Sequence, residues 1–402
     1  MTIQLNAHRL NRYNMAIAVL AGLSIICASN LSWGFWGLDL SSSLPFWLRL
    51  FLLSAIILFA IPPMANRTGP LIEQVLSLIS NTGFTLLYFS GLLLALFVFI
   101  YLSTNNYFQG DGYNVMGHLI GGHLFSPTEP LDYLVHFAVS ALLGGGEIGV
   151  LRSYQICSYL AGAVFITGIF FYFRNKREII IAISIAGAFG IMQFFFGYVE
   201  SYTFRFLFMF FYLLSATGDF EKKTVSGATI TYFIFSIAFH LSSIVLIPSF
   251  VGLIINAYRT KKVIAATISL AVLLCLIAAS AIIFFAPINL RDILIPILAK
   301  PQNPYFLISI AHLKDLLNSF LISSPLIVLL FLKSPNTGGS SMIWKGLIFV
   351  PPLLFMILVD PKIGAFRDPA RSIGFLGCSS SVAPTRRPYQ AAPALSLGLW
   401  AA

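Results

Sequence analysis

Charged side chains are scarce in this chain. Asp, Glu, Lys and Arg together make up 9% of the 402 residues, whereas 58% are hydrophobic. A water-soluble domain carries about 25% charged residues, so the composition excludes an ordinary soluble globular fold. The 24 Lys and Arg outnumber the 14 Asp and Glu, but they stand in short clusters between apolar runs. That placement is typical of membrane topology signals and argues against nucleic acid as a partner.

Cysteines are also few, and they are scattered at Cys27, Cys157, Cys275 and Cys378. They show neither the spacing of a zinc site nor the density of a disulfide framework. Three histidines share one segment, at His118, His123 and His136. Their spacing does not place them on one helix face, so the sequence does not predict a histidine metal site.

Apolar runs recur at about 20 residues, the length that crosses a bilayer as a helix. We predict spans at 14–35, 45–63, 83–103, 151–173, 179–198, 203–217, 227–240, 243–258, 263–286, 316–332 and 344–360. The predicted fold is therefore an all-α polytopic membrane bundle of about eleven spans. The lipid bilayer is its surrounding, and the N-terminus is expected in the cytoplasm.

The apolar stretch 228–258 is about thirty residues long, which fits either one strongly tilted helix or two short ones. Cations flank it on both sides, at Lys222 and Lys223 and again from Arg259. If both clusters lie in the cytoplasm, the chain must cross an even number of times between them. We therefore predict a helical hairpin that turns near His240.

No Lys or Arg occurs between Ser103 and Val150, although the protein as a whole is basic. Outer loops of membrane proteins are poor in cations, so this segment is predicted to lie outside the membrane. We expect two interfacial helices in this first large outer loop, at 113–121 and 130–143. The second opens with proline at a helix-start position.

Three regions follow from this pattern. Residues 1–82 form an N-terminal membrane hairpin and cytoplasmic linker, and 83–368 form the transmembrane core with the outer loop 103–150. The composition changes after Asp368 to Ala, Pro, Ser and Arg, so 369–402 is predicted to be a disordered or aberrant tail.

The outer loop holds the first acidic candidates. Asp111 stands between two glycines, where a carboxylate can take a proton from a hydroxyl or hold a metal ion. The alternative is a helix cap for the segment from Tyr113. Glu129 and Asp132 either point to the same site or favour the start of the second interfacial helix.

A second polar group lies in the short connection 197–205, which includes Tyr198, Glu200 and Arg205. A carboxylate and a guanidinium at the end of a span are unfavourable unless they are paired or hydrated. They either form an ion pair with each other, or Arg205 binds a phosphate through its forked donors.

The remaining candidates are His240, at the tip of the predicted hairpin, and Lys362 and Arg367, beyond the last predicted span. His240 either contacts substrate or is a hydrogen-bonded interior residue. Lys362 and Arg367 either hold phosphate or anchor the chain at the interface. If the site is shared, Asp111, Glu200, His240 and Arg367 should meet at the outer rim of the bilayer.

Four short motifs at 110–112, 126–132, 197–202 and 366–368 read Gly-Asp-Gly, Ser-Pro-Thr-Glu-Pro-Leu-Asp, Gly-Tyr-Val-Glu-Ser-Tyr and Phe-Arg-Asp. In this order the chain from 83 to 368 resembles the GT-C superfamily of membrane glycosyltransferases, and most nearly its uncharacterised bacterial multi-spanning members. The resemblance implies transfer of a sugar from a polyprenyl-phosphate donor to a glycan, lipid or protein acceptor. It places the reaction at the outer face of a bacterial cytoplasmic membrane.

The resemblance also implies roles for the candidates. Asp111 would be the general base or would hold a divalent cation, Mg or Mn. Residues that would bind substrate are Glu129, Asp132, Tyr198, Glu200, Arg205, His240, Lys362 and Arg367. Two other functions stay open at this stage: a transporter or flippase for a lipid-linked glycan, and a membrane assembly protein without catalysis.

Overall fold

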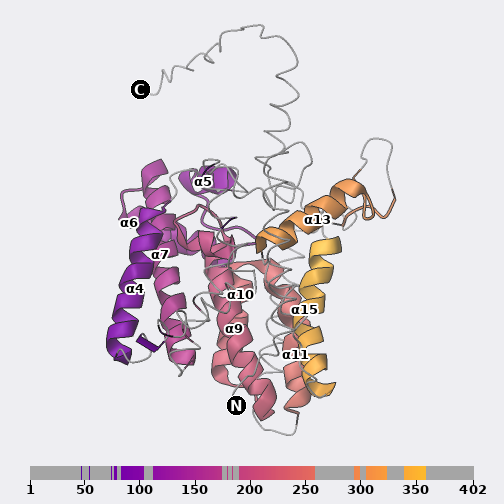
Figure 1. The fold of residues 1–402 in the computed structure, drawn as a ribbon. Coiled ribbons are helices and arrows are strands. Elements are labelled where there is room, and N and C mark those ends of the chain that lie inside the picture. Colours follow the sequence, from indigo (N-terminus) through magenta and orange to yellow (C-terminus); the bar gives the residue numbers. More distant parts are fainter. Residues whose placement is uncertain are drawn as a thin grey trace, which may run out of the picture.

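The computed structural model describes residues 83–103, 112–173, 190–258, 294–298, 305–323 and 339–358, together with isolated positions at 47, 54, 74, 77, 78, 179 and 183. Every element in these ranges is a helix, which confirms the predicted all-α class. The long helices run alongside one another, and α5, α6 and α13 lie toward one end of the bundle (Figure 1).

The α-helices are α4 (Phe84–Tyr101), α5 (Gly112–Ile120), α6 (Pro130–Leu142), α7 (Gly146–Tyr172), α9 (Tyr202–Lys222), α10 (Gly227–Phe239), α11 (Ile247–Asn256), α13 (Ile310–Ser323) and α15 (Gly339–Leu358). Two short 3-10 helices are η3 (Gly190–Phe195) and η4 (Leu241–Leu246).

Within the described residues, α4 and α7 are the two helices long and apolar enough to cross a membrane. They pack together where Gly162 of α7 lacks a side chain, since a Cβ there would lie 2.5 Å from Cε2 of Phe99. The outer side of α4 leaves Leu86 and Phe97 more than 60% exposed. An exposed apolar row of this kind is typical of a surface that contacts lipid or a partner.

The other predicted spans are confirmed only in part. Helices α10 and η4–α11 are apolar but shorter than a full crossing. The predicted spans 14–35 and 263–286 lie outside the described residues, as does the tail 369–402. The count of about eleven spans therefore stays a prediction.

Several boundaries differ from the prediction. Helix α7 begins at Gly146 rather than 151, and α9 continues to Lys222 rather than 217. Helix α13 begins at Ile310 rather than 316 and runs aslant across the end of the bundle (Figure 1). Hydropathy marks only the apolar centre of a helix, so polar turns at helix ends escape it.

Hydrogen bonds to the Asp219 side chain stabilise the connection between α9 and α10. One carboxylate oxygen of this buried residue accepts from the Ser226 backbone N–H at 2.7 Å and from the Thr229 hydroxyl at 2.6 Å. The other accepts from Thr224 at 3.2 Å. A negative charge at the start of α10 also suits the helix dipole.

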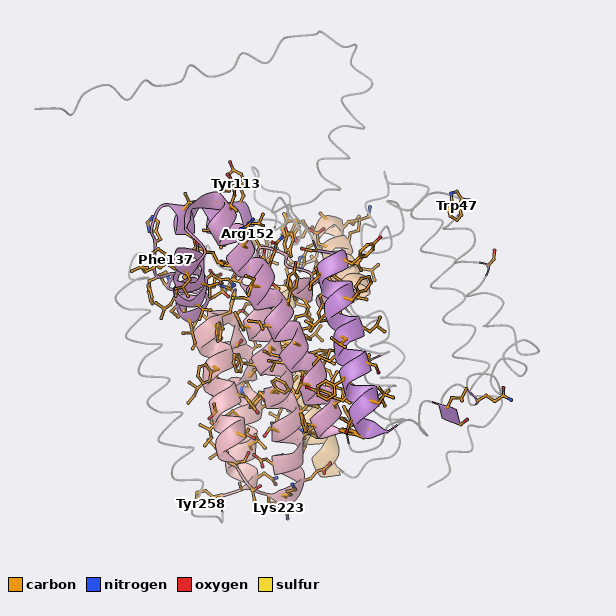
Figure 2. All side chains as sticks on the ribbon, turned by 90° about the vertical axis from the view of Figure 1, so that its left-hand side faces the viewer. Trp47, Tyr113, Phe137, Arg152, Lys223 and Tyr258 are labelled. Atoms are coloured by element: carbon orange, nitrogen blue, oxygen red, sulfur yellow. The ribbon has the colours of Figure 1, made fainter. Side chains whose placement is uncertain are left out.

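The chain from α10 to α11 forms the predicted hairpin, and its turn is at His240. The backbone of His240 is extended (φ −159°, ψ 121°), which ends α10 and starts η4. The two arms are antiparallel, because Phe233 stacks on Phe250 at 4.2 Å. Lys223 and Tyr258, which flank the hairpin, lie at the same end of the bundle, opposite Tyr113 and Arg152 (Figure 2).

Both helices predicted for the segment 103–150 are present, as α5 and α6. Pro130 occupies a helix-start position in α6, as predicted. Val115 and Leu119 of α5 pack with Tyr133 of α6 and Tyr154 of α7 in one buried cluster. Helices α5 and α6 are thereby held against the end of the bundle that carries the hairpin tip.

We expect the Asp219→Ala variant to lose about 1–3 kcal/mol of unfolding free energy, because buried donors of α10 lose their charged acceptor. The measurement is thermal unfolding of the purified protein in detergent. The matched control is Glu221→Ala, since Glu221 lies two residues away and is exposed. Equal effects of the two substitutions would show that Asp219 does not hold this connection.

Candidate functional site

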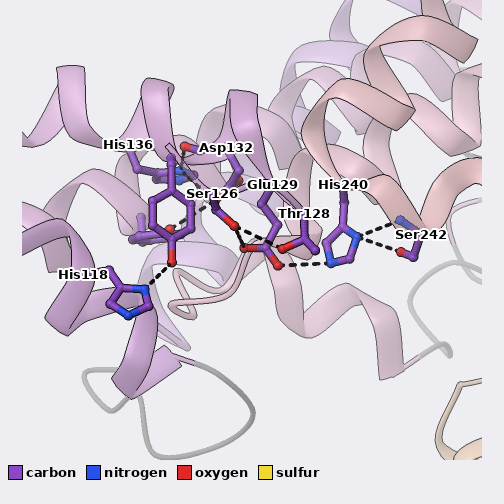
Figure 3. A network of polar contacts seen from close by, with 10 residues as sticks. His118, Ser126, Thr128, Glu129, Asp132, His136, His240 and Ser242 are labelled. Atoms are coloured by element: carbon purple, nitrogen blue, oxygen red, sulfur yellow. Dashed lines mark hydrogen bonds and ion pairs between the residues drawn. The ribbon is translucent and has the colours of Figure 1, made fainter. Parts of the chain in front are cut away.

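Polar residues from three segments far apart in sequence meet at the end of the bundle that carries α5 and α6. Two of these segments, the loop before α6 and the hairpin tip at 240–242, are seen in Figure 3. The third is the turn 197–201 before α9, whose Ser201 side chain bonds Glu129. The predicted residues Glu129, Asp132, Tyr198, Glu200, Arg205 and His240 all belong to these segments or to the helices that they open. Asp111, Lys362 and Arg367 lie outside the described residues.

Glu129 makes the central contact of the site. Its Oε1 lies 3.3 Å from Nε2 of His240, and the two side chains are only 14% and 10% exposed. Its Oε2 accepts a hydrogen bond from the Ser126 hydroxyl at 3.3 Å, and the Ser201 side chain adds another. Burial alone would raise the pKa of this carboxyl, but the hydrogen bonds from His240, Ser201 and Ser126 outweigh it. The pKa of Glu129 is therefore below its ordinary value, and the group is ionised at neutral pH.

His240 is engaged on both ring nitrogens. Nδ1 lies 3.1 Å from the backbone nitrogen of Ser242 and 2.7 Å from its hydroxyl oxygen, while Nε2 faces Glu129. The ring also stacks on Tyr202, with centroids 4.8 Å apart. Neither nitrogen is open to a ligand in this arrangement. The geometry therefore favours a role in holding Glu129 over direct contact with substrate.

A backbone hydrogen bond accompanies the Glu129–His240 contact. The amide N–H of Leu241 donates to the carbonyl oxygen of Thr128 at 2.7 Å. The loop before α6 and the hairpin tip are thus joined at two adjacent points, one through side chains and one through the main chain.

Arg205 lies one turn into α9, with its guanidinium carbon 5.5 Å from the centre of the Tyr202 ring. Its Nε is buried and has no hydrogen-bond partner among the described residues. Burying a guanidinium N–H without an acceptor is unfavourable. Arg205 is therefore the described cation best suited to receive an anionic group.

The turn before α9 depends on Gly197. This residue has φ +76°, and a Cβ at its position would lie 2.9 Å from Cγ of Gln155. Only glycine adopts this conformation at low cost. The turn buries Tyr198 (8% exposed) and Glu200 (4% exposed). Their predicted contacts with substrate stay predictions.

Asp132 is fully buried and belongs to a separate cluster within α6 and α7. Tyr154 donates to its Oδ2 at 3.1 Å, and Nδ1 of His136 lies 3.3 Å from the same oxygen. The ring of His136 stacks on Tyr154 at 3.6 Å. This geometry favours a structural role for Asp132 over substrate binding. Asp132 lies in the first turn of α6, where the sequence also allowed a role in stabilising the helix start.

The charge of Asp132 acts strongly on His136. Burial alone would lower the pKa of His136, but the neighbouring carboxylate raises it to about 10. His136 Nδ1 also donates to the backbone carbonyl of Asp132 at 2.9 Å. The two residues therefore form a buried ion pair one helical turn apart.

The other histidines of this segment pair locally. Nδ1 of His118 lies 3.1 Å from the Tyr133 hydroxyl, and the ring of His123 lies 5.3 Å from that of His118. Among the described residues, no group of three or more His, Cys, Asp or Glu could hold a metal ion. The predicted divalent cation depends on Asp111 and stays a prediction.

Sequence reasoning missed the residues that organise Glu129 and His240, namely Ser126, Ser201, Tyr202 and Ser242. Hydroxyl groups are common in loops and carry no spacing signal of their own. The one available signal was the position of Ser242, two residues after a histidine at a predicted turn. Side chains at such positions often bond the local backbone.

No protein-family model, curated protein or solved structure matches this chain. The chemistry of the site and the arrangement of the helices around it are therefore what indicate a function.

The His136→Gln variant tests the buried pair through pH. Because its pKa is raised from 6.5 to about 10, His136 contributes its full stabilisation below pH 6.5, and this is lost as pH rises toward 10. We expect the difference in melting temperature between wild type and His136→Gln to be largest at pH 6.5 and to shrink by pH 10. The exposed His123→Gln variant should show no such trend. A difference that stays constant with pH would contradict a charged pair.

Proposed function

We propose that this protein is a membrane glycosyltransferase that moves a sugar from a polyprenyl-phosphate donor to an acceptor at the outer face of a bacterial cytoplasmic membrane. The observation that carries the proposal is the convergence of Glu129, His240 and Arg205 at one end of an apolar helical bundle. The resemblance of the four sequence motifs to the GT-C superfamily adds the reaction type.

The distribution of polarity fits a lipid-linked substrate. Helices α4 and α7 are long and apolar. The ionisable groups of the site gather around Glu129, directly before α6. A polyprenyl-phosphate sugar has the same division, with an apolar tail and a phosphosugar head. We propose that the tail lies along the helices and the head at the polar end.

Arg205 is proposed to bind the donor phosphate. Its buried Nε has no acceptor among the described residues, and phosphate oxygens would supply one. The Tyr202 ring beneath the guanidinium limits its orientation. A cation placed here stabilises the phosphate as negative charge develops on it during bond breaking.

In the proposed reaction the oxygen of an acceptor hydroxyl attacks the anomeric carbon of the sugar. The bond between that carbon and the phosphate oxygen breaks, and polyprenyl phosphate leaves. Asp111, which precedes the first residue of α5, is proposed to take the hydroxyl proton. Glu129 is proposed to hold the sugar or the acceptor, with His240 keeping its carboxylate in place. A divalent cation, if bound, would offset phosphate charge.

We expect Glu129→Gln to lower sugar transfer about ten- to hundredfold, because hydrogen bonds to a charged group are worth about 1.5–3 kcal/mol. Asp111→Asn should lower it about 10²- to 10⁴-fold through loss of the base. The measurement is a screen of polyprenyl-phosphate sugars with the purified full-length protein in lipid nanodiscs.

The control is Glu147→Gln, which removes an exposed carboxylate near the start of α7. It should transfer sugar at the wild-type rate. Wild-type protein without transfer from any donor would contradict the proposed function. Ion-driven uptake of a lipid-linked glycan into vesicles would support a transporter instead.

A further inference from the structure

The protonation of His240 follows from its neighbours. A backbone N–H can only donate, so Nδ1 of His240 must accept the hydrogen bond from the Ser242 amide at 3.1 Å. Nδ1 therefore carries no proton. The neutral ring then has its one proton on Nε2, which lies 3.3 Å from Oε1 of Glu129.

The Ser242 hydroxyl supports the same assignment. Because Nδ1 offers a lone pair, the hydroxyl at 2.7 Å is the donor in that contact. Ser242 thus directs two donors at one ring nitrogen, and the opposite nitrogen donates to an ionised carboxylate.

The contacts from Ser242 to His240 and from His240 to Glu129 have the same spatial order as a catalytic triad. In serine hydrolases these positions are the nucleophile, the base and the acid that orients the base. In such a site the histidine must take the serine proton on the nitrogen that faces the hydroxyl. Here that nitrogen already faces the Ser242 amide at 3.1 Å. A proton on Nδ1 would point at another N–H, so the arrangement opposes the transfer that a nucleophile needs.

We infer that Ser242 is a positioning residue: it fixes the Nε2–H tautomer of His240 and so aims the Glu129 carboxylate at the site. The inference rests on the proposed function for its effect on sugar transfer. The assignment of the tautomer depends only on contacts within the protein.

The remaining groups around His240 fit this role. Tyr202 stacks on one face of the ring and limits its rotation. The positive charge of Arg205 disfavours a second proton on the ring, and the negative charge of Asp132 favours it, so the two effects oppose each other. The backbone at His240 is extended, and its ring accepts from the Ser242 amide two residues further on, so the turn itself holds the ring that donates to Glu129.

The experiment has a spectroscopic arm. In full-length protein labelled with ¹⁵N-histidine, the His240 signals are assigned by their loss in the His240→Gln variant. We expect a protonated Nε2 and an unprotonated Nδ1 at neutral pH. A ring protonated at Nδ1, alone or on both nitrogens, would overturn the inference.

The kinetic arm uses Ser242→Ala, Ser242→Thr and the control Ser90→Ala, which removes an exposed hydroxyl that donates to the Leu87 carbonyl within α4. Loss of one hydrogen bond should lower kcat about fivefold for Ser242→Ala with little change in KM. Ser242→Thr should restore kcat, and Ser90→Ala should match wild type. An unchanged kcat in Ser242→Ala would overturn the positioning role.

Two further outcomes separate the alternatives. Labelling of wild type, but not of Ser242→Ala, by a fluorophosphonate probe would overturn the inference and identify Ser242 as a nucleophile. A wild type that transfers no sugar but shows the Nε2–H spectrum would contradict the proposed function and still support the assignment of His240.

Discussion

A buried carboxylate must be surrounded by donors, and in this protein that requirement joins the loop before α6 to the bundle. Glu129 leaves water on folding and receives hydrogen bonds from Ser126, Ser201 and His240, which belong to three different segments. An ionised carboxylate left without them would be strongly destabilising. The position of the loop before α6, the turn before α9 and the hairpin tip are therefore interdependent.

Hydrogen bonds hold the helical hairpin whose turn carries His240. Tyr212 and Ser249 share a hydrogen bond of 2.8 Å between α9 and α11, and Asn256 donates to the Phe220 carbonyl at the far end. Asp219 closes the connection between α9 and α10. Hydrogen bonds thus stabilise the apolar hairpin near both ends. His240, at the turn of this hairpin, contacts Glu129.

Much of this arrangement could be predicted from sequence. Composition and the length of apolar runs indicated an all-helical protein, and the cation clusters around 228–258 indicated a hairpin with its turn near His240. Pro130 marked the start of α6. These features are local, since each depends on residues within a few turns of one another.

The pairing of side chains could not be predicted in the same way. Glu129 and His240 are more than one hundred positions apart, and neither has a spacing pattern that points to the other. Asp132 and His136 are one helical turn apart, but their complete burial depends on how α6 packs on α7. Helix ends were also misplaced where polar turns extend an apolar core, as at Gly146 and Lys222.

The central claim is that Glu129 and His240 stabilise the protein as a pair. A double-mutant cycle on unfolding free energy, with Glu129→Gln, His240→Gln and the double variant in detergent, tests it most directly. We predict that the sum of the losses of unfolding free energy in the two single variants exceeds the loss in the double variant by at least about 1 kcal/mol. The reason is that each side chain is the hydrogen-bond partner of the other. Losses that add within about 0.5 kcal/mol would contradict the account.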